Sequence, residues 1–485
     1  MRQKYLGVAS VTVLMLSSGA VQALPFNSFD PRSMAMGGMG VAVGDPSTAP
    51  LFNPALLSAS DPSKKFALEL PIIGGRLYDP GNLRNELTTL SDNVNALNSS
   101  ITLVNTNSAT GATATQLQQL PSNMATVSSN INKVNSSLQT LNNQPLQGEF
   151  GAAMVVGVPG KNWGVGFYTN AYGAVGGTLL YKDATTLSNL STSVSAASTA
   201  LSSTTGSAAA ACTSVQNGTG TATDVSTCLA AATAINASLV NAKGAVNFNT
   251  NTQIASQIHL RGVAISEAGL ALSHGLIFHD QAWSIGVTPK IMQLQLFDAY
   301  LAANNGSSTS NVTGSDYLAK YSTLNFDMGA VRDFENGWRS GLVVKNVVPQ
   351  TFDFKSIGAG ATSGSAQSVT GTLSLNPQVR AGLSHENAWS TVGLDVDLTK
   401  NDPAGMENQS QYVALGGELS ALGWAQLRAG YRADMVNAAR NVASLGLGIS
   451  PRFPYFKPHF DLAVAGNTDA TTKELGASLR FGMNF

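Results

Sequence analysis

The last twelve residues, ELGASLRFGMNF, constrain the fold more than any other part of the sequence. Every second residue is apolar, and the residues between them are glycine, serine, arginine and asparagine: the apolar set is Leu475, Ala477, Leu479, Phe481, Met483 and Phe485. Successive side chains of a strand point to opposite faces, so one face of this strand is wholly apolar. Strands of soluble proteins are usually nearer five or six residues long. The pattern therefore predicts a strand of a transmembrane β-barrel, with lipid on one face and the lumen on the other.

The same alternation recurs along the C-terminal half, for example in STVGLDVDLT, WAQLRAGYR and VASLGLGIS. It predicts fourteen strands, at residues 65–72, 148–157, 163–172, 256–277, 282–297, 321–333, 337–347, 376–386, 388–399, 409–420, 423–434, 441–450, 455–466 and 473–485. An even number of strands returns both chain ends to the same side of the barrel. Short turns alternate with long connections along the predicted strands, as in outer-membrane barrels. Aromatic residues lie near many predicted strand ends, as an interfacial girdle requires: Trp283, Trp338, Trp389, Trp424 and Tyr455. The predicted fold class is an all-β, 14-stranded antiparallel transmembrane barrel over residues 63–485.

Composition agrees with this prediction without deciding it. Charged residues are 11% of the chain, against ~25% in ordinary soluble domains. The formal net charge of −1 gives no electrostatic reason to expect a nucleic-acid partner. A secreted, adhesin-like β protein has a similar composition, and the long alternating strands are what favour the barrel.

Residues 1–23 have the pattern of a secretory signal peptide. Arg2 and Lys4 precede an apolar run over residues 5–16, and Val21-Gln22-Ala23 resembles a cleavage site, which places the mature N-terminus at Leu24. The alternative is an N-terminal membrane anchor, but the run is short for the ~20 residues that a spanning helix needs. The chain is therefore expected to be exported.

An insertion at residues 80–146 changes the periodicity from two to that of a helix. Apolar residues are spaced alternately by four and three, first at Leu83, Leu87, Leu90, Val94, Leu97, Ile101 and Val104, and later at Met124, Val127, Ile131, Val134, Leu138 and Leu141. This spacing predicts an antiparallel helical hairpin with arms of ~30 Å, in which Pro121 occupies the first turn of the second helix. The alternative is a disordered loop rich in serine, threonine and asparagine.

A second insertion, at residues 182–250, has a weaker helical pattern and contains both cysteines of the chain. An exported protein with two cysteines is expected to pair them, so a Cys212–Cys228 disulfide is predicted at the tip of a second hairpin. Closing a loop of this size contributes ~3 kcal/mol. A redox or metal role is poorly supported, because there is no CxxC spacing and no neighbouring histidine. Both insertions are expected to leave the barrel on its outer side, where they are able to pack on each other.

No catalytic or cofactor motif stands out, and neither a metal nor a cofactor is predicted. The histidines have no metal-ligand spacing, and the pairs Ser273-His274 and Ser384-His385 are adjacent in predicted strands, so their side chains point to opposite faces. Six charged residues are predicted to face the lumen: Asp395, Asp397, Glu418, Arg428, Arg432 and Arg480. They either line a channel or pair with one another and with a plug.

The Gly-rich stretch GGMGVAVGDPSTAPLFNPA raises the question of a phosphate-binding loop. It lacks the G-x-G-x-x-G spacing and follows coil rather than a strand. Glycine permits close backbone approach, and Pro46, Pro50 and Pro54 suit irregular coil. The stretch is better interpreted as a plug that folds back inside a barrel.

These residues carry a family resemblance. The segments DPRSMAMGGMGVAVGD and PLFNPALL resemble the N-terminus of the FadL-like outer-membrane superfamily, in which they form a hatch inside a fourteen-stranded barrel. The matching positions are Arg32, Met36, Gly37, Gly38, Gly40, Asn53, Pro54 and Ala55, which implies a hatch at residues 24–62. The terminal Phe485 resembles the C-terminal signal that the barrel-assembly machinery reads. Within the superfamily the chain most resembles the TraF-type conjugal transfer family.

The resemblance implies a bacterial outer-membrane location and no enzyme activity. It leads us to expect a passive channel for small hydrophobic solutes, a surface component of plasmid transfer, or both. The alternative is a recognition protein whose helical hairpins contact another envelope protein or a recipient-cell protein, with no transport role.

Overall fold

The computed structural model describes residues 22–23, 29–59, 66–108, 113–202, 207–239, 255–302, 318–357, 371–402, 404–406, 408–420, 422–451, 453, 456–468 and 473–485. Most of the predicted signal peptide, residues 1–21, lies outside the described residues, as do the predicted mature N-terminus at Leu24 and the girdle residue Tyr455.

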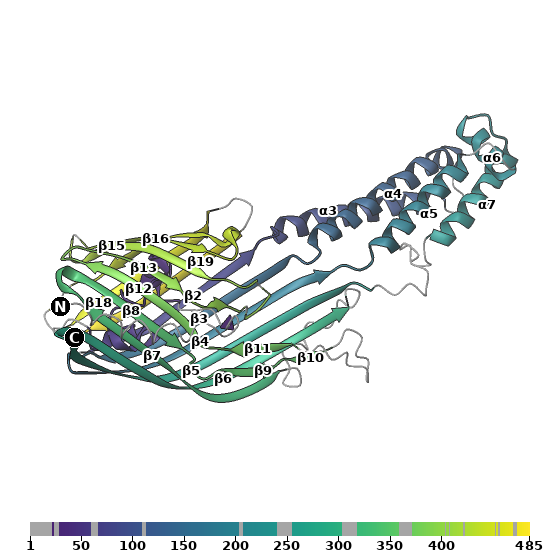
Figure 1. Ribbon diagram of the computed structural model, residues 1–485. Helices are drawn as coiled ribbons and strands as arrows, with labels where there is room; N and C mark the ends of the chain where they lie inside the picture. Colours follow the sequence, from purple (N-terminus) through teal and green to yellow (C-terminus); the bar gives the residue numbers. More distant parts are fainter. Residues whose placement is uncertain are drawn as a thin grey trace, which may run out of the picture.

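Fourteen strands of the described chain close into a barrel (Figure 1). In chain order they are β2 (Ala67–Asp79), β3 (Pro145–Val158), β4 (Trp163–Leu180), β5 (Gln257–Phe278), β6 (Gln281–Ala302), β7 (Ala319–Asp333), β8 (Trp338–Lys345), β12 (Gln378–Glu386), β13 (Ser390–Asp397), β15 (Tyr412–Leu419), β16 (Ala425–Asp434), β17 (Val442–Ile449), β18 (Lys457–Asn467) and β19 (Lys473–Asn484). Each pairs antiparallel with its neighbours, and the β19–β2 pairing completes the ring. Every predicted strand is confirmed.

The predicted faces of the last strand are confirmed as well. Leu475 and Leu479 are 64% and 39% exposed, whereas Ser478 and Arg480 are each 3% exposed. The exposed side chains belong to the outer face, and the buried ones point into the barrel.

Several strands are longer than predicted. β4 continues to Leu180 rather than residue 172, and β2 continues to Asp79 rather than residue 72. Their outer parts, GAVGGTLL and GGRLYD, contain glycines that interrupt the alternation of apolar and polar residues. The strands of the wall therefore differ in length. β5 and β6 have 22 residues each, whereas β8, β13, β15 and β17 have 8 each.

Residues 29–59, here called the inner segment, cross the interior of the barrel. They include α1 (Pro31–Ala35), α2 (Ala49–Phe52) and the 3-10 helix η1 (Pro54–Leu57). Helix α1 contacts β16–β19, and α2 and η1 contact strands of the opposite wall between β3 and β7. The turn after α1 needs glycine, because Gly37 and Gly38 have φ angles of 77° and 97°. Gly40 needs to lack a side chain, since a Cβ there would lie 2.2 Å from the Phe52 ring.

The connection between β8 and β12 folds against the inner wall and was not predicted to contain strands. β9 (Gln350–Asp353) and β11 (Thr372–Leu375) form an antiparallel pair, and β10 (Lys355–Ile357) pairs parallel with β6. Side chains of β9 and β11 join an apolar core with inward-facing residues of β4–β6. This core includes Phe352, Leu373, Val263, Ile265 and Leu294. Two further short strands, β1 (Gln22–Ala23) and β14 (Lys400–Asn401), pair parallel with each other, and two short 3-10 helices, η4 (Glu335–Gly337) and η5 (Ala438–Arg440), precede β8 and β17.

Both insertions are helical and together form an arm that projects from the barrel (Figure 1). The first contains α3 (Leu83–Asn107) and α4 (Ala114–Leu141), and the second contains α5 (Ala184–Leu201), α6 (Ser207–Gln216) and α7 (Ala222–Leu239). The two insertions pack on each other, because α4 contacts both α3 and α5. Among the described helices, none is long and apolar enough to cross a membrane.

Two details of the predicted arm are wrong. Pro121 lies inside α4 rather than in its first turn, because a capping box between Thr113 and Gln116 starts the helix earlier. The second insertion has three helices instead of a hairpin: Gly218, with φ 74°, follows α6, and Thr221 accepts a hydrogen bond from the Asp224 amide to start α7.

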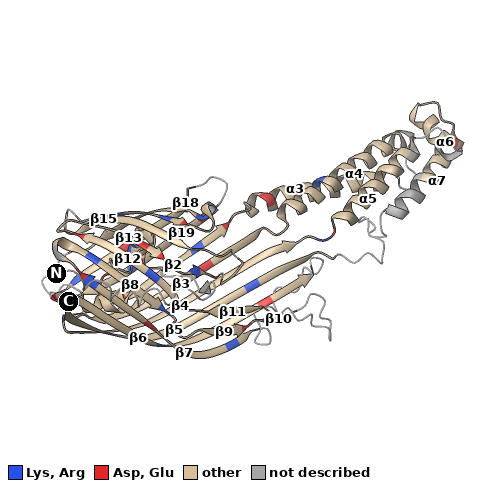
Figure 2. Ribbon diagram, in the orientation of Figure 1, with Lys and Arg blue, Asp and Glu red and all other residues tan. Residues whose placement is uncertain are grey.

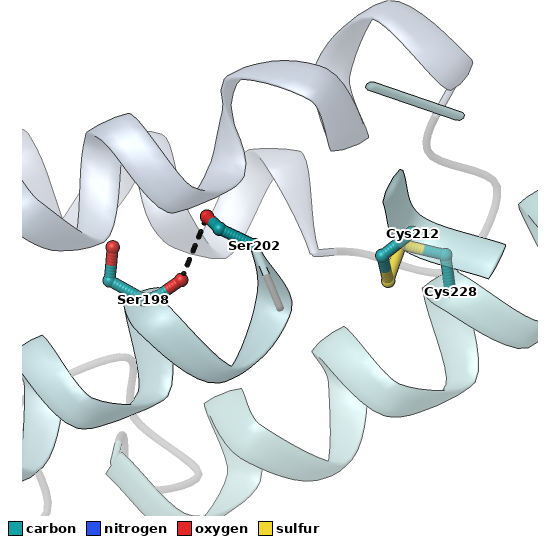
Figure 3. The surroundings of a disulfide bond; sticks show 4 residues. All are labelled: Ser198, Ser202, Cys212 and Cys228. Atoms are coloured by element: carbon teal, nitrogen blue, oxygen red, sulfur yellow. Dashed lines mark hydrogen bonds between the residues drawn. A yellow bond between two sulfur atoms is a disulfide. The ribbon is translucent and has the colours of Figure 1, made fainter. Parts of the chain in front are cut away.

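The predicted disulfide between Cys212 and Cys228 is present and joins α6 to α7 (Figure 3). Both cysteines are buried in an apolar cluster with residues of α3 and α4. Nearby, at the end of α5, the Ser202 hydroxyl donates to the Ser198 carbonyl over 3.1 Å (Figure 3). The disulfide therefore links α6 to α7, and the linked pair packs against the two long helices.

Replacing both cysteines, Cys212→Ser with Cys228→Ser, should destabilise the arm tip by about 3 kcal/mol, the value expected for a closed loop of this length. Unfolding in urea, monitored through the hydrogen exchange of amides in α6 and α7, would measure the loss of stability. Ser202→Ala, which removes only an exposed hydroxyl, is the matched control and should change the midpoint little. Equal midpoints for the double variant and the unaltered protein would contradict the prediction.

The arm joins the wall through a set of hydrogen bonds around Asp183. The carboxylate accepts the backbone amides of Ala255 and Ser256 at 2.9 Å each, and it also accepts the Ser256 hydroxyl. Burial raises the pKa of Asp183, but these hydrogen bonds outweigh it and lower the pKa below its usual value. Since the folded pKa is depressed, the stabilisation is complete above the unfolded pKa of about 3.9 and is lost as the pH falls through the folded value.

Amide protection at Ala255 and Ser256 should therefore be high at pH 6 and fall as the pH drops below about 4. Hydrogen exchange read by mass spectrometry checks this directly. In Asp183→Asn the protection should be lower at pH 6 and nearly independent of pH. A pH-dependent loss that persists in Asp183→Asn would show that another group is responsible.

Candidate functional site: the barrel interior

Charged residues are spread over the strands of the barrel, while the arm has few (Figure 2). Arg480, on β19, lies at the centre of one cluster. It donates to Asp30 at the start of α1 over 2.8 Å and to Asp461 on β18 over 2.6 Å, and Glu69 on β2 lies 3.6 Å away. All four side chains are at least 95% buried. A buried guanidinium surrounded by carboxylates ties three parts of the chain together: the inner segment, β2 and the β18–β19 hairpin.

A second contact holds the other side of α1. Arg32 Nε donates to Glu418 Oε2 on β15 over 2.8 Å, and the same carboxylate accepts Arg428 Nε of β16 over 2.7 Å. Arg428 also contacts Asp461, so the two clusters form one continuous chain of ion pairs. Arg32 makes a further bond to the Val43 carbonyl, which draws the inner segment together.

Asp395 holds the Gly-rich part of the inner segment. Its Oδ2 accepts the backbone amides of Gly40 and Val41 at 2.8 and 3.0 Å. Close by, Asp397 accepts Arg380 Nε over 2.5 Å, and Arg380 Nη1 donates to the Gly38 carbonyl over 3.2 Å. The wall thus binds the backbone of the inner segment as well as its side chains.

Asn53-Pro54-Ala55 forms a local cap that orients η1. The Asn53 side-chain oxygen accepts the Ala55 amide over 3.1 Å, and its nitrogen donates to the Val41 carbonyl over 3.0 Å. Pro54 stands in the first turn of η1, where a missing N–H costs little. This geometry explains why an Asn-Pro-Ala sequence follows the glycines.

On the opposite wall, Lys290 of β6 lies between two carboxylates. Its Nζ is 3.1 Å from Glu267 and 3.0 Å from Asp327. Lys345 of β8 donates to the Leu51 carbonyl of α2 over 2.5 Å. The inner segment is therefore bound by charged residues on both sides of the barrel.

A polar cavity lies beside the turn that follows α1. It is lined by Ser33, Met34, Gly37 and Gly38 of the inner segment and by wall residues Arg76, Arg380, Asp395, Tyr412, Ala414, Arg432, Val442, Ser444, Ala465 and Glu474. Glu474 is shared by three arginines, Arg432 at 2.5 Å, Arg76 at 3.7 Å and Arg440 at 3.9 Å. The space there that water-sized molecules can occupy is about 50 Å³.

A second hollow lies on the outer face of the barrel, over β4–β8. Its lining is apolar and includes Trp163, Ile285, Val287, Met328 and Leu342. These side chains are all at least 37% exposed. The hollow belongs to the apolar outer surface rather than to the interior.

The structure places the six predicted lumen charges in the interior, where each lies in the network described above. It brings Glu418, Arg428 and Arg480 together through Asp461, and it places Arg432 at Glu474. Several partners were missed by the sequence reasoning: Asp30, Glu69, Arg76, Arg380, Asp461 and Glu474. The alternation of apolar and polar residues could have identified Asp461 as inward-facing, because it lies between Phe460 and Leu462 in a predicted strand.

The serine–histidine pairs behave as adjacent strand residues should. Ser273 contacts Ser58 of the inner segment, whereas His274 stacks on the outward-facing Trp163 at 4.4 Å. Likewise Ser384 donates to the Ala42 carbonyl, and His385 packs on Trp338. No cluster of three or more potential metal ligands occurs among the described residues.

Comparisons with known proteins give one family match. The model of the family described as "F plasmid transfer operon, TraF, protein" matches residues 50–397, well over half of the chain. No curated protein gives a significant match. Similar solved structures include the Ralstonia pickettii toluene transporter TbuX, with 12% identity over 95% of this chain and 99% of that chain and a TM-score of 0.45. The monoaromatic hydrocarbon channel CymD has 12% identity over 95% and 98%, with a TM-score of 0.46. The Pseudomonas putida toluene transporter TodX has 10% identity over 96% and 98%, with a TM-score of 0.43.

Proposed function

The chain belongs to the F plasmid transfer operon TraF protein family, and from this premise we propose that it is an outer-membrane passive channel for small solutes, closed by its inner segment. The observation that carries the proposal is the way the inner segment fills the bore. It is attached by ion pairs and hydrogen bonds from Arg480, Glu418 and Asp395, and no strand pairing joins its described residues to the wall. All of these contacts are non-covalent, so the segment is able to shift while the barrel stays closed as a ring.

The outer face supports a location in a membrane. Large apolar side chains are widely exposed there, for example Leu415 at 59%, Leu427 at 56% and Leu445 at 62%. Trp389 and Trp424, 56% and 52% exposed, lie at the turns, as expected of an interfacial girdle. Insertion by the barrel-assembly machinery through a C-terminal signal at Phe485 belongs to the same proposal.

A reversible tether tests whether movement of the inner segment opens the bore. A Cβ built on Gly382 would lie 3.0 Å from Val41 Cβ, close to the ~3.5–4.5 Å of disulfides, and 2.4 Å from Asp395 Oδ1, so the Asp395 carboxylate has to shift to admit the tether. Val41→Cys with Gly382→Cys, oxidised and reconstituted into liposomes, should block solute entry, and reductant should restore it. The unaltered protein with and without reductant is the control, because its own disulfide is also reduced. Equal solute entry with and without the tether would contradict the proposal.

The arm favours a second candidate function, recognition during plasmid transfer. Helices α3 and α4 have 25 and 28 residues, so each is about 40 Å long. Lengths of that kind exceed what closing a pore requires. The arm is also firmly attached to the wall, through Asp183 and through Tyr181, which donates to Asn135 of α4 over 2.6 Å. An envelope protein or a recipient-cell protein would be its partner.

Deleting residues 83–141 and 184–239 separates the two functions. The barrel should still migrate faster in unheated than in heated gel samples, and solute entry should persist. Plasmid transfer or partner binding should be lost. If transfer is unaffected while solute entry fails, the arm serves the channel and the recognition role is wrong.

A further inference from the structure

The apolar hollow on the outer face of β4–β8, here called the outer hollow, is built from two rows of outward-facing side chains. The strand register places one row across all five strands: Trp163, His274, Ile285, Ala330 and Leu342. The second row is two residues nearer the arm on each strand and contains Leu272, Val287, Met328 and Val344. Ala330 is small and lies between two large side chains, which makes the surface concave there.

The outer hollow has the chemistry and the dimensions of a site for a hydrocarbon chain. About 700 Å³ of it is open to water-sized molecules. Its two small polar side chains are used elsewhere: Ser273 contacts Ser58 of the inner segment, and His274 Nδ1 lies 2.6 Å from the Asn162 carbonyl. Five strands spaced ~4.8 Å apart give the hollow a length of ~19 Å. An acyl chain of one leaflet spans about half of the ~30 Å hydrocarbon core, so one chain fits within that length.

A cation lies at the edge of the outer hollow that faces the short turns. The next row of the register on that side contains Trp283, Arg332 and Ser340. The Arg332 guanidinium carbon is 5.5 Å from the centre of the Trp283 ring and 4.3 Å from that of Phe334. The neighbouring Asp333 points to the other face and pairs with Arg339. Among the side chains that the structure describes, none forms an ion pair with Arg332.

This placement matches the headgroup level of a membrane. Aromatic side chains gather at that level, and a cation on the lipid-facing side of a barrel is tolerated there far better than at mid-depth. A guanidinium presents a planar fork of donors that fits the oxygens of a phosphate. The two aromatic rings hold that fork in place before a ligand arrives. Phosphate and acyl chain are thus recognised side by side, by Arg332 and by the outer hollow.

We propose that the outer hollow binds one phospholipid, with its phosphate at Arg332 and an acyl chain across β4–β8. The proposal rests on the membrane location given under the proposed function, and it does not depend on whether the barrel conducts solutes. Because the two recognition elements lie on adjacent rows of one sheet face, a molecule that carries both groups should bind more tightly than a molecule that carries either alone.

Tryptophan quenching locates the lipid on the full chain purified in detergent. The chain has five tryptophans, so two single-tryptophan variants are made by replacing the other four with phenylalanine. One variant keeps Trp163, which lines the outer hollow, and the other keeps Trp424, at the turn before β16. The probes are phosphatidylglycerol with dibrominated acyl chains and a diacylglycerol with the same chains, which lacks the phosphate.

Phosphatidylglycerol should quench Trp163 at about tenfold lower concentration than Trp424, because one charge-assisted bond is added to the contact of the chain. The diacylglycerol should lose most of this preference. Glycerol 3-phosphate, which has the phosphate but no acyl chain, should not displace the brominated lipid from Trp163.

Variants of the wall assign the two parts of the site. Arg332→Gln should abolish the preference of phosphatidylglycerol for Trp163. Lys457→Gln is the matched control and should leave the preference unchanged, because Lys457 is an exposed cation at the same end of the barrel on β18. Ala330→Phe fills the centre of the outer hollow and should weaken quenching of Trp163 by both lipids. A mobility difference between heated and unheated gel samples shows that each variant is folded.

Three results would overturn the inference: phosphatidylglycerol quenching Trp163 and Trp424 alike, the diacylglycerol keeping the full preference for Trp163, or a folded Arg332→Gln barrel with unchanged preference. None of these measurements involves solute entry. If the tethered barrel admits solutes freely while the lipid preference holds, the gating proposal fails and the lipid site stands. If the barrel conducts as proposed but shows no lipid preference, the lipid site alone is wrong.

Discussion

Deletion of residues 30–59 should open the bore and raise single-channel conductance in planar lipid bilayers by on the order of tenfold, because a barrel near porin size contains an aqueous channel when nothing fills it. These residues contribute the contacts of Asp30, Arg32 and Asn53 across the interior. The wall keeps its own ion pairs, such as Arg428–Asp461 and Arg380–Asp397. The barrel is therefore expected to fold without the inner segment.

Folding of the deletion variant is checked by the mobility difference between heated and unheated gel samples. A milder variant, Arg32→Ala, removes one attachment and should give brief openings rather than a permanent pore. A folded deletion variant that conducts no more than the unaltered protein would show that the inner segment does not close the bore.

The second large effect concerns the stability of the barrel. Arg480→Met should destabilise it by about 3–5 kcal/mol, because Asp30, Asp461 and Glu69 would be left as buried carboxylates without their shared guanidinium. Guanidinium chloride unfolding in lipid vesicles, followed by tryptophan fluorescence, measures the change. Arg339→Met is the comparison: its ion pair with Asp333 is partly exposed, and it donates one hydrogen bond to the Ala59 carbonyl over 2.7 Å, so the loss should stay below about 2 kcal/mol.

Neutralising one of the three carboxylates that Arg480 contacts should recover part of the lost stability. Adding Asp30→Asn to Arg480→Met removes one stranded charge, so the double variant should be more stable than Arg480→Met alone. A loss below about 1 kcal/mol for Arg480→Met, or no recovery in the double variant, would mean that water already compensates the carboxylates.

The wall of the barrel was predictable because its signal is local. A strand with one exposed apolar face and one polar face toward the interior has to alternate, so the sequence alone indicates that Leu445 points outward and Ser444 inward. The outer ends of β2 and β4 were missed because that signal disappears where glycines interrupt it. Strands β9–β11 were missed for a related reason: they are only three or four residues long and obtain their partners from distant residues.

The interior was predictable only in part. The alternation identified Asp395 and Arg428 as inward-facing, yet it carries no information about which inward residues meet. Asp30 pairs with a residue 450 positions away, and Glu418 is shared between Arg32 and Arg428. The path of the inner segment decides these pairings. Similarly, α6 was missed because its ten residues, SAAAACTSVQ, are mostly alanine and small polar residues and have little apolar periodicity.

The unequal lengths of the strands have a consequence for how molecules arrive. At ~3.3 Å per residue and a tilt near 40°, β5 and β6 rise about 55 Å, whereas the eight-residue strands rise about 20 Å. A lipid-facing band is about 25 Å tall, so only the long side stands well above it. The barrel wall is therefore lower over β13–β17 than over β5 and β6. For the membrane channel proposed above, solutes would then enter over this lower side, from the layer next to the membrane surface rather than from directly above.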